Sequence, residues 1–333
     1  MIRVTYYQRK PVKGSQSVER LFADVRGHLP EAIEATICVS QYASQGFWKR
    51  IVNIVDAWFH QADVNHVTGD VHFLTYLLTR RKTILTILDC VMMERLRGFR
   101  RWIFWFLWLW LPEKRCGVIT VISEATRQQV LNFVQCDPQK VRVIYCNVSD
   151  EFKPAFRVFN QSCPRILQVG TSPNKNIERV VAALEGLTCK FVIIGHLSES
   201  HIVALNKSGI EYENLVNLSR EDLLSEYVAC DLLMFVSTYE GFGLPIVEAN
   251  AVGRPVITSN IWSMPEVAGD AACLIDPFNV SEIRAAVMRI INDADYRDQL
   301  LANGFENVKR FQIETIALQY ADLYREIFVN SRD

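Results

Sequence analysis

The stretch from Ser237 to Glu248 joins a glycine loop to two glutamates, and it holds the clearest chemistry in the chain. The apolar run Leu232–Val236 before it predicts a buried strand, and Pro245 predicts the start of a helix with Glu248 on its first turn. Unpaired N–H groups at a helix N-terminus attract anions, and the helix dipole favours negative charge there. The pattern therefore predicts a phosphate site. Glu248 is placed to bind a ribose diol, and Glu240 to face whatever the phosphates carry.

Two glutamates at this separation are ordinary surface groups unless something else marks them. Here Gly-Phe-Gly-Leu-Pro (residues 241–245) lies between them, and the stretch resembles the Glu-x7-Glu signature of retaining nucleotide-sugar glycosyltransferases of family 4. The resemblance continues through Gly253–Ile257, Pro265–Val267 and Gly269–Ala272. It implies the α/β architecture called GT-B, in which two Rossmann-like domains, each a doubly wound parallel sheet, face a cleft. It also implies a nucleotide-sugar donor and no metal or other cofactor.

The composition fits two ordinary domains and argues against a nucleic-acid partner. With 333 residues, half of them hydrophobic, the chain can bury two cores. The net charge of −1 and the pI near 6.6 give no field for nucleic acid. The nine cysteines lack the spacing of a metal site and indicate a reducing compartment, while Met1–Tyr7 is typical of a strand and not of a signal peptide. We therefore expect a cytoplasmic protein.

Short apolar runs alternate with amphipathic stretches, which favours parallel α/β sheets. The predicted strands are Ile2–Tyr6, Ala35–Val39, Asp63–His66, Lys82–Leu88, Val118–Val121, Val141–Ile144, Arg165–Val169, Lys190–Ile194, Leu215–Leu218, Leu232–Val236, Pro255–Thr258 and Ala272–Ile275. A polar stretch between 147 and 164 interrupts the pattern and is the best place for a domain boundary. We expect an acceptor-side domain over 1–155, a nucleotide-sugar domain over 156–312, and a final helix within 313–333 that, by the resemblance, packs back on the first domain.

The second predicted domain opens with a strand and a loop, Val169–Ile177, that contains one lysine. Its backbone donors and Lys175 suit a pyrophosphate held without a metal. The family often has arginine in this loop where Thr171 and Asn174 stand here. Glu240 and Lys175 are accordingly the predicted catalytic residues of this domain. The predicted donor contacts in this domain are Gly170, Thr171, Gly195, Phe242, Gly243, Leu244 and Glu248.

The first predicted domain supplies acceptor contacts and groups near the reacting carbon. A glycine loop around Gly14 follows the first strand and resembles the family's loop that approaches the donor phosphate. The family usually carries a histidine after the third strand, and here His66, Asp70 and His72 compete for that role. We favour Asp70 and His72 as catalytic residues, on the side that faces the cleft.

Residues 97–115 combine arginines and lysine with ten consecutive apolar residues, Trp102–Leu111. Ten residues are too few to cross a bilayer as a helix, which takes roughly 20. Either the segment is a buried helix of the first domain, or it makes a peripheral membrane contact with tryptophan in the headgroup region and basic residues near anionic lipid.

Together these features predict a retaining hexosyltransferase that uses GDP-mannose or a UDP-sugar and acts by front-face displacement without a metal. The acceptor is expected to be a glycan or a lipid-linked glycan in bacterial surface polysaccharide synthesis, at the inner face of the membrane. A sugar-nucleotide epimerase or phosphorylase of the same fold remains an alternative, as does a non-catalytic membrane-associated scaffold. An NAD-dependent oxidoreductase is disfavoured, because the chain contains no Gly-x-Gly-x-x-Gly.

Overall fold

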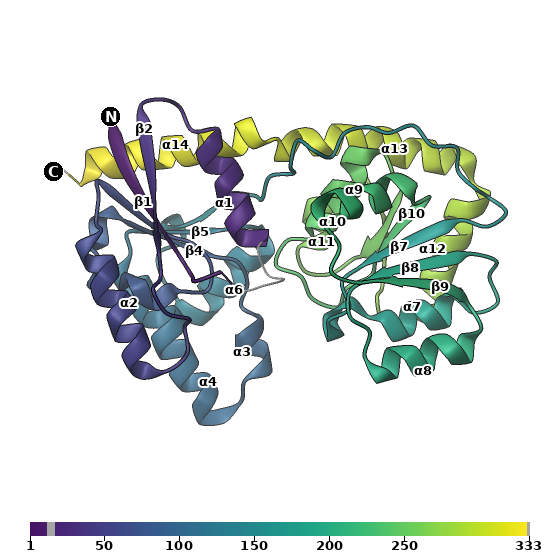
Figure 1. Ribbon diagram of the computed structural model, residues 1–333, viewed down its shortest axis with the longest axis horizontal. Helices are drawn as coiled ribbons and strands as arrows, with labels where there is room; N and C mark the ends of the chain where they lie inside the picture. The colour runs from purple at the N-terminus through teal and green to yellow at the C-terminus, as the bar shows by residue number, and fades with distance from the viewer. Residues whose placement is uncertain (12–16, 332–333) are drawn as a thin grey trace. The chain divides into compact units, whose positions relative to one another are not determined.

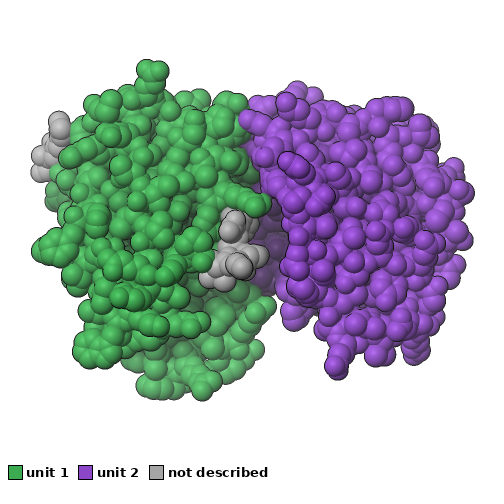
Figure 2. Space-filling view, viewed as in Figure 1, with its two compact units in different colours: residues 1–147, 313–333 green, residues 148–312 purple. Residues whose placement is uncertain are grey.

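The computed structural model describes residues 1–11 and 17–331, and the predicted contact Gly14 lies outside them. The chain forms two compact units (Figures 1 and 2). Unit 1 comprises Met1–Asn147 and Ile313–Asp333, and unit 2 comprises Val148–Gln312. Each unit is built on one six-stranded parallel sheet with helices packed around it (Figure 1). The prediction of two doubly wound parallel-sheet domains is therefore confirmed.

The sheet of unit 1 has the strand order β2-β1-β3-β4-β5-β6. Its strands are β1 (Ile2–Gln8), β2 (Ile33–Val39), β3 (Val64–Val67), β4 (Thr83–Ile87), β5 (Val118–Val121) and β6 (Val141–Val143). Strands β3, β4 and β5 are buried along their whole length, as expected for a parallel sheet covered on both faces. The order of the strands reverses between β1 and β3, so the loops that follow these two strands meet at the carboxyl edge of the sheet.

In the described part of unit 1, the helices are four longer ones and several short elements. Its longer helices are α1 (Ser17–Gly27), α2 (Phe47–Phe59), α6 (Glu124–Val134) and α14 (Ile313–Asn330). The short elements are η1 (His72–Leu77), η2 (Arg80–Lys82), α3 (Val91–Arg95), α4 (Gly98–Phe104), the π-helical η3 (Trp105–Trp110), α5 (Leu111–Arg115) and η4 (Pro138–Lys140). Of these, α4, η3 and α5 form the segment predicted to be either core or membrane contact. The final helix α14 is joined to the sheet by a 2.6 Å hydrogen bond between the hydroxyls of Tyr324 and Tyr6, both buried.

The sheet of unit 2 has the strand order β12-β11-β10-β7-β8-β9. Its strands are β7 (Arg165–Val169), β8 (Lys190–Ile194), β9 (Glu211–Leu215), β10 (Leu232–Phe235), β11 (Val256–Ser259) and β12 (Cys273–Ile275). Its helical elements are η5 (Pro173–Lys175), α7 (Ile177–Leu184), α8 (Glu199–Ser208), α9 (Arg220–Ala229), α10 (Leu244–Val252), α11 (Met264–Ala268), α12 (Val280–Asn292), α13 (Ala294–Val308) and η6 (Lys309–Phe311). One core of aliphatic side chains from β7, β8, β10, α7 and α12 holds this unit together.

Two details differ from the sequence-based expectation. The strand expected at Leu215–Leu218 is wrong, because β9 spans Glu211–Leu215. It is an edge strand with charged, partly exposed side chains, and such strands lack the apolar run that marks buried ones. The division of the chain at Asn147 also differs from the expected boundary at 155, because Phe152 is buried and packs edge-on against Tyr227 of α9, with ring centroids 5.3 Å apart.

The segment 97–115 divides between the two alternatives. Trp108 and Leu109 belong to the core of unit 1 and are 9% and 2% exposed. Phe99 and Trp102 on α4, in contrast, are 73% and 54% exposed. No helix in the described part of the chain combines the length and the apolar composition needed to cross a membrane.

Candidate functional site

Two of the predicted loops lie side by side because of the topology of the sheet in unit 2. Strand β7 has β8 on one side and β10 on the other, so the strand order reverses there. The register pairs Leu232 and Leu233 of β10 with Ile166 and Leu167 of β7. Open parallel sheets bind ligands outside the carboxyl ends of the strands at such a switch point. The loops after β7 and β10 contain Lys175 and Glu240 respectively.

Asn174 joins these two loops. Its backbone carbonyl accepts a 2.7 Å hydrogen bond from the Thr238 N–H. Its side-chain Nδ2 donates to the carbonyl of Tyr239 at 2.8 Å and to Oε1 of Glu240 at 3.1 Å. The residue found where related chains often have arginine is therefore used here to fix the position of the Glu240 carboxylate. The sequence did not indicate this role, since the partners are separated by more than sixty residues.

Lys175 and Glu240 form an ion pair, with Nζ donating to Oε1 at 2.6 Å. Both side chains are 15% exposed, and Nζ also lies 4.3 Å from the centroid of the Phe235 ring. The two predicted catalytic residues are thus brought together, and each neutralises the other in the ligand-free chain. An anion that binds Lys175 would have to share the ammonium group with Glu240 or replace it.

Two glycines make room for the side chains of this site. Gly170 has a φ of +89°, and a Cβ added there would lie 2.9 Å from Cε of Lys175. Gly195, after β8, has a φ of +130°, and a Cβ there would lie 2.8 Å from Oγ1 of Thr171. Thr171 uses that space to donate a 2.7 Å hydrogen bond to the carbonyl of His196. Three of the predicted donor contacts therefore share one small region at the end of β7 and β8.

The glutamate loop, residues 237–243, is held by side chains that bind its carbonyls. These bonds run from Ser259 Oγ to Ser237 O at 2.6 Å, from Trp262 Nε1 to Thr238 O at 2.9 Å, and from Ser263 Oγ to Glu240 O at 3.0 Å and to Phe242 O at 2.8 Å. Because a planar trans peptide fixes the next N–H opposite the carbonyl, these bonds set the direction of the loop's N–H groups as well. The loop is therefore preorganised before any ligand arrives.

Helix α10 begins directly after this loop, with Gly243 as its N-cap and Pro245 in its first turn. Because the helix starts at Leu244, Glu248 lies on its second turn, whereas the sequence predicted the first turn. The Tyr227 hydroxyl, from α9, donates a 2.6 Å hydrogen bond to Oε2 of Glu248. Burial raises the pKa of Glu248, while the hydrogen bond from Tyr227 and the charge of Arg220 lower it. Tyr227 is a contact that the sequence pattern did not reveal.

Trp262 is a second residue of the site that the sequence did not indicate. It has a φ of +57°, a left-handed backbone that is strained for a bulky side chain. Its indole binds the glutamate loop through Thr238, and its ring centroid lies 5.0 Å from that of Tyr239. The side chain is 41% exposed, so the pair presents an aromatic surface next to Glu240. The sequence feature that could have indicated this role is the presence of a tryptophan between the strand β11 and the Pro265–Val267 motif.

In unit 1, His66 lies in β3, a strand beside the switch point of its sheet, and Asp70 and His72 follow that strand. His66 is fully buried, and its two ring nitrogens lie 2.8 Å from the Tyr324 hydroxyl and 2.7 Å from Oγ1 of Thr86. Burial lowers the pKa of His66 to about 3. His66 is therefore a neutral core residue between β3, β4 and α14.

Asp70 and His72 are both bound to Trp108 of η3. Asp70 is exposed and its Oδ1 accepts from the indole N–H of Trp108 at 3.0 Å. His72 is buried, and its Nδ1 lies 2.6 Å from the Trp108 carbonyl. Because a carbonyl only accepts, Nδ1 carries the proton and Nε2 is left as an acceptor. Burial lowers the pKa of His72, so the ring stays neutral.

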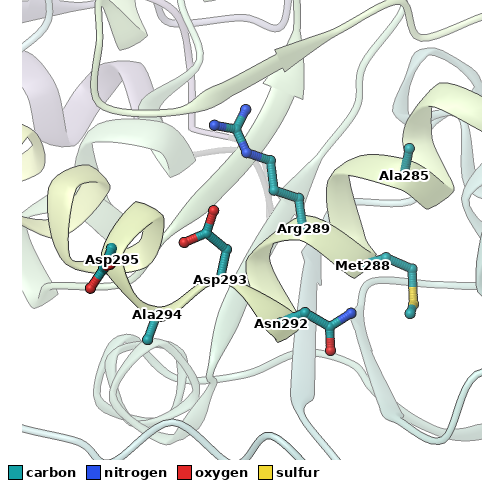
Figure 3. A pocket seen from close by; sticks show the side chains of 7 residues that line it. All are labelled: Ala285, Met288, Arg289, Asn292, Asp293, Ala294 and Asp295. Carbon is teal, nitrogen blue, oxygen red and sulfur yellow. The ribbon is translucent and has the colours of Figure 1, made fainter.

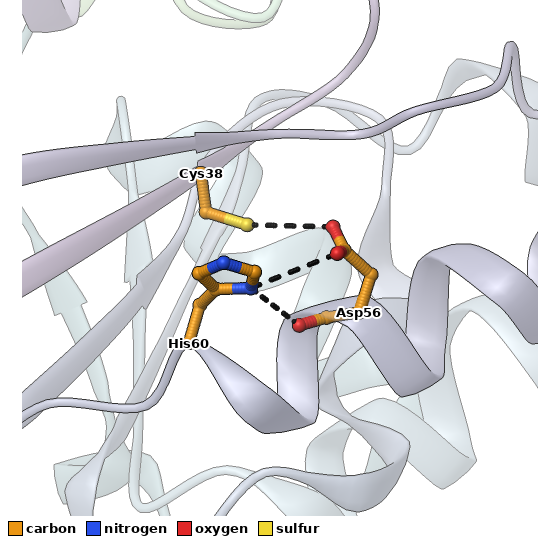
Figure 4. Close-up of side chains that lie close together, drawn as sticks. All are labelled: Cys38, Asp56 and His60. Carbon is orange, nitrogen blue, oxygen red and sulfur yellow. Dashed lines mark hydrogen bonds and ion pairs between the residues drawn. The ribbon is translucent and has the colours of Figure 1, made fainter.

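Two other features of the surface lie apart from these residues. A hollow between the end of α12 and the start of α13 is lined by Arg289 and Asp293 among others (Figure 3), and none of its lining residues is a predicted site residue. Cys38, Asp56 and His60 lie close enough to one another to share a metal ion (Figure 4). However, Nδ1 of His60 donates to the Asp56 carbonyl at 2.7 Å, and burial raises the pKa of the Cys38 thiol to about 11. The histidine therefore caps the C-terminal end of α2.

Comparisons with known proteins address the family and the fold. Residues 150–307 match the family described as glycosyl transferases group 1. The O-antigen chain mannosyltransferase B of Escherichia coli is 40% identical over 105 residues, which are 32% of this chain and 28% of that protein. The MMP alpha-(1->4)-mannosyltransferase of Mycolicibacterium hassiacum is 27% identical over 225 residues, 62% of this chain and 54% of that protein. This chain thus spans between about a quarter and about a half of the length of these curated relatives.

Among solved structures, HepE from Anabaena in complex with UDP and glucose matches with a TM-score of 0.79 at 16% identity, over 98% of this chain and 100% of that chain. At this identity the likeness establishes the fold. Residues 150–307, somewhat less than half of the chain, resemble the glycosyl transferases group 1 family, and the two parallel-sheet units have the GT-B architecture. The recognition made from residues 237–272 is confirmed at that level, while membership of the retaining family 4 stays a prediction.

Proposed function

We propose that this protein is a glycosyltransferase that moves a hexose, with mannose favoured, from a nucleotide-diphosphate sugar to a glycan or lipid-linked acceptor. The observation that carries the proposal is the contact between Lys175 and Glu240 at the switch point of unit 2. It combines a cation for a diphosphate with a carboxylate for sugar hydroxyls, beside the helix N-terminus of α10. The mannosyltransferase names of the relatives support the choice of mannose and of bacterial surface polysaccharide synthesis.

In the proposed complex, the diphosphate binds at the start of α10 and pairs with Lys175, and the ribose hydroxyls bind Glu248. Once the diphosphate has taken over Lys175, the Glu240 carboxylate is free to accept hydrogen bonds from the hexose. Asn174 keeps that carboxylate in place during the exchange, because its own bond to Oε1 does not depend on Lys175. Gly170, Thr171 and Gly195 shape the edge of the site next to the base and the phosphates.

The proposed reaction is a front-face displacement that retains configuration. The bond between the anomeric carbon and the phosphate oxygen breaks, the acceptor hydroxyl forms the new bond from the same face, and its proton passes to the departing phosphate oxygen. Lys175 and the N-terminus of α10 stabilise the charge of the leaving diphosphate, so no metal ion is required. Most of the rate then comes from positioning and from preorganised charges.

Unit 1 is proposed to contribute Asp70 and His72 to the donor sugar and the loop around Gly14 to the donor phosphate and acceptor. The hydrogen bond from His72 Nδ1 to Trp108 leaves Nε2 as an acceptor for a sugar hydroxyl. A lipid-linked acceptor would be met at the inner face of the cytoplasmic membrane, which is the proposed location. The alternatives, an epimerase, a phosphorylase or a scaffold of the same fold, predict other products or none, and product analysis with and without acceptor separates them.

The test is thermal unfolding of the pure protein with UDP, GDP and ADP, each with and without EDTA. Saturation at about 100 times the dissociation constant adds roughly 2.7 kcal/mol to the free energy of unfolding, which is visible as a rise in Tm. We expect a rise with one nucleotide that survives EDTA, is lost in Glu248→Ala and is kept in Glu240→Ala, a variant that no longer transfers sugar. No rise with any nucleotide would overturn the donor site, and loss of the rise with EDTA would overturn its metal independence.

A further inference from the structure

Helix α2 of unit 1 turns an apolar face to the solvent. Its inner side is narrow, with Asn53 and Ala57 each 1% exposed. On the other side stand large apolar side chains that are between 39% and 76% exposed: Phe47, Trp48, Val52, Val55, Trp58 and Phe59. At 3.6 residues per turn these six residues, here called the α2 face, fall in one continuous sector. A helix on the surface of a water-soluble domain normally shows the reverse pattern.

The inner side of α2 is fixed by hydrogen bonds and not only by packing. Asn53 donates from Nδ2 to the carbonyl of Tyr42 at 2.8 Å and accepts from the Tyr42 N–H at 3.1 Å. Rotating the helix to bury its aromatic side chains would break both bonds and expose Ala57. The outward direction of the α2 face is therefore a built feature of unit 1.

A second exposed aromatic patch lies on α4, which the same core joins to α2. Phe99 and Trp102 stack with ring centroids 5.8 Å apart and are both more than half exposed. Helix α4 continues into η3, and the guanidinium carbon of Arg50, on α2, lies 4.7 Å from the ring centroid of Trp108 there. In Figure 1, α4 lies at the lower end of unit 1, and α2 and α3 extend into the same lower part of the unit. Both patches therefore belong to the same compact unit, and the contact between Arg50 and Trp108 links the elements that carry them.

The charges around these patches are mostly positive. The segment 91–104 contains four arginines and one glutamate, and Arg95, Arg97 and Arg100 are exposed. On α2, Lys49 is exposed, while its single acid, Asp56, is half-buried. Exposed tryptophan and phenylalanine with arginine and lysine at their edges is the composition of a helix that lies in a membrane interface.

We propose that the α2 face and the α4 patch dock on an anionic lipid surface, with the aromatic rings at headgroup depth and Lys49 and Arg100 on the lipid phosphates. A second copy of the chain fits less well. A two-fold contact sets the same surface against itself, so the four arginines of each segment 91–104 would meet only one glutamate from each copy. This proposal does not depend on the transfer reaction, although a lipid-linked acceptor would make the contact useful.

The test is co-sedimentation of the whole protein with vesicles of phosphatidylcholine alone and with vesicles that also contain phosphatidylglycerol. We expect binding to the anionic vesicles, weakened by salt, with a blue shift of tryptophan fluorescence. The double variant Trp48→Ser with Phe59→Ser should lower the affinity at least about tenfold. Lys49→Glu and Arg100→Glu should each lower it about fivefold or more. The matched control is Phe156→Ser with Phe278→Ser, which removes two exposed aromatic rings from unit 2 and should leave binding unchanged.

Three outcomes would overturn the proposal: no binding to either vesicle, equal losses in the control variant, or a wild-type dimer that Trp48→Ser with Phe59→Ser converts to a monomer. The last outcome would assign the α2 face to a second copy. All variants should keep the wild-type Tm, because the replaced side chains are largely exposed. The variants should also keep the rise of Tm with nucleotide. Co-sedimentation therefore tests lipid binding, and the rise of Tm tests the donor site independently of it.

Discussion

Replacing Gly170 with alanine tests whether the site depends on the space that this glycine leaves for Lys175. An added Cβ would lie 2.9 Å from Cε of Lys175, so the lysine side chain must shift from the position in which it binds Glu240. The backbone adds a separate cost, because a φ of +89° is unfavourable for alanine by about 1–2 kcal/mol. The matched control is Gly209→Ala, at the C-cap of α8. Gly209 has a φ of +67°, and no described atom lies within 4 Å of its added Cβ.

The difference between the two variants isolates the lysine. Both should lose about 1–2 kcal/mol of unfolding free energy to backbone strain. Gly170→Ala should lose about 1.5–3 kcal/mol more, the usual contribution of a charge-assisted hydrogen bond such as the one from Lys175 to Glu240. Urea unfolding followed by circular dichroism measures these losses. Nucleotide-induced stabilisation and sugar transfer should fall strongly in Gly170→Ala and stay at wild-type levels in Gly209→Ala.

The reasoning fails if Gly170→Ala is no less stable than Gly209→Ala and still responds to nucleotide as the wild type does. Lys175 would then reach its partner by another route, and the positive φ at Gly170 would be a feature of the turn alone. A Gly170→Ala variant that loses stability but keeps full sugar transfer would instead show that the reaction does not need the ion pair between Lys175 and Glu240. The first result would remove Gly170 from the proposed site, and the second would remove the ion pair of Lys175 from the proposed mechanism.

Three further changes have expected outcomes. Burial raises the pKa of Glu248, so the folded wild-type chain loses stability as the pH rises through that pKa. The variant Glu248→Gln should therefore be at least as stable as the wild type near pH 7 in thermal unfolding, and this advantage should shrink toward about pH 4.5. The same variant should bind nucleotide less well. Trp262→Gly should be about 1 kcal/mol more stable than Trp262→Ala in urea, because glycine tolerates a φ of +57°. Asp231→Ala leaves Arg157 without its 2.7 Å partner and should cost about 3–5 kcal/mol, seen as an early melting transition.

The sequence predicted the sheets well because most of their strands are buried and therefore continuously apolar. Eleven of the twelve strands lie where an apolar run stood, and the exception, β9, is a charged edge strand. The order of the strands was not predictable from these runs. The resemblance to a known family predicted doubly wound sheets but not the order of their strands, and this order brings the loops after β7 and β10 together.

The positions of Lys175, Glu240 and Glu248 were predictable because each sits on a local strand, loop and helix pattern. Their partners were not. Tyr227 reaches Glu248 and Asn174 reaches Glu240 across distances in sequence that no local pattern encodes. The prediction that Glu248 lies on the first turn of its helix was also wrong, because α10 begins at Leu244, one residue before Pro245.

The ion pair between Lys175 and Glu240 explains how such a site stays folded when it is empty. A lysine and a glutamate that are each 15% exposed would be costly if they stood alone, and pairing offsets part of that cost. The same pairing makes the site responsive. A diphosphate offers Lys175 more negative charge than Glu240 does, so its arrival can exchange the partner of the lysine and free the carboxylate where the sugar lies. Asn174 then decides where the freed carboxylate points, since it binds both Glu240 and the neighbouring Tyr239 carbonyl. Donor binding and the orientation of Glu240 become one coupled step.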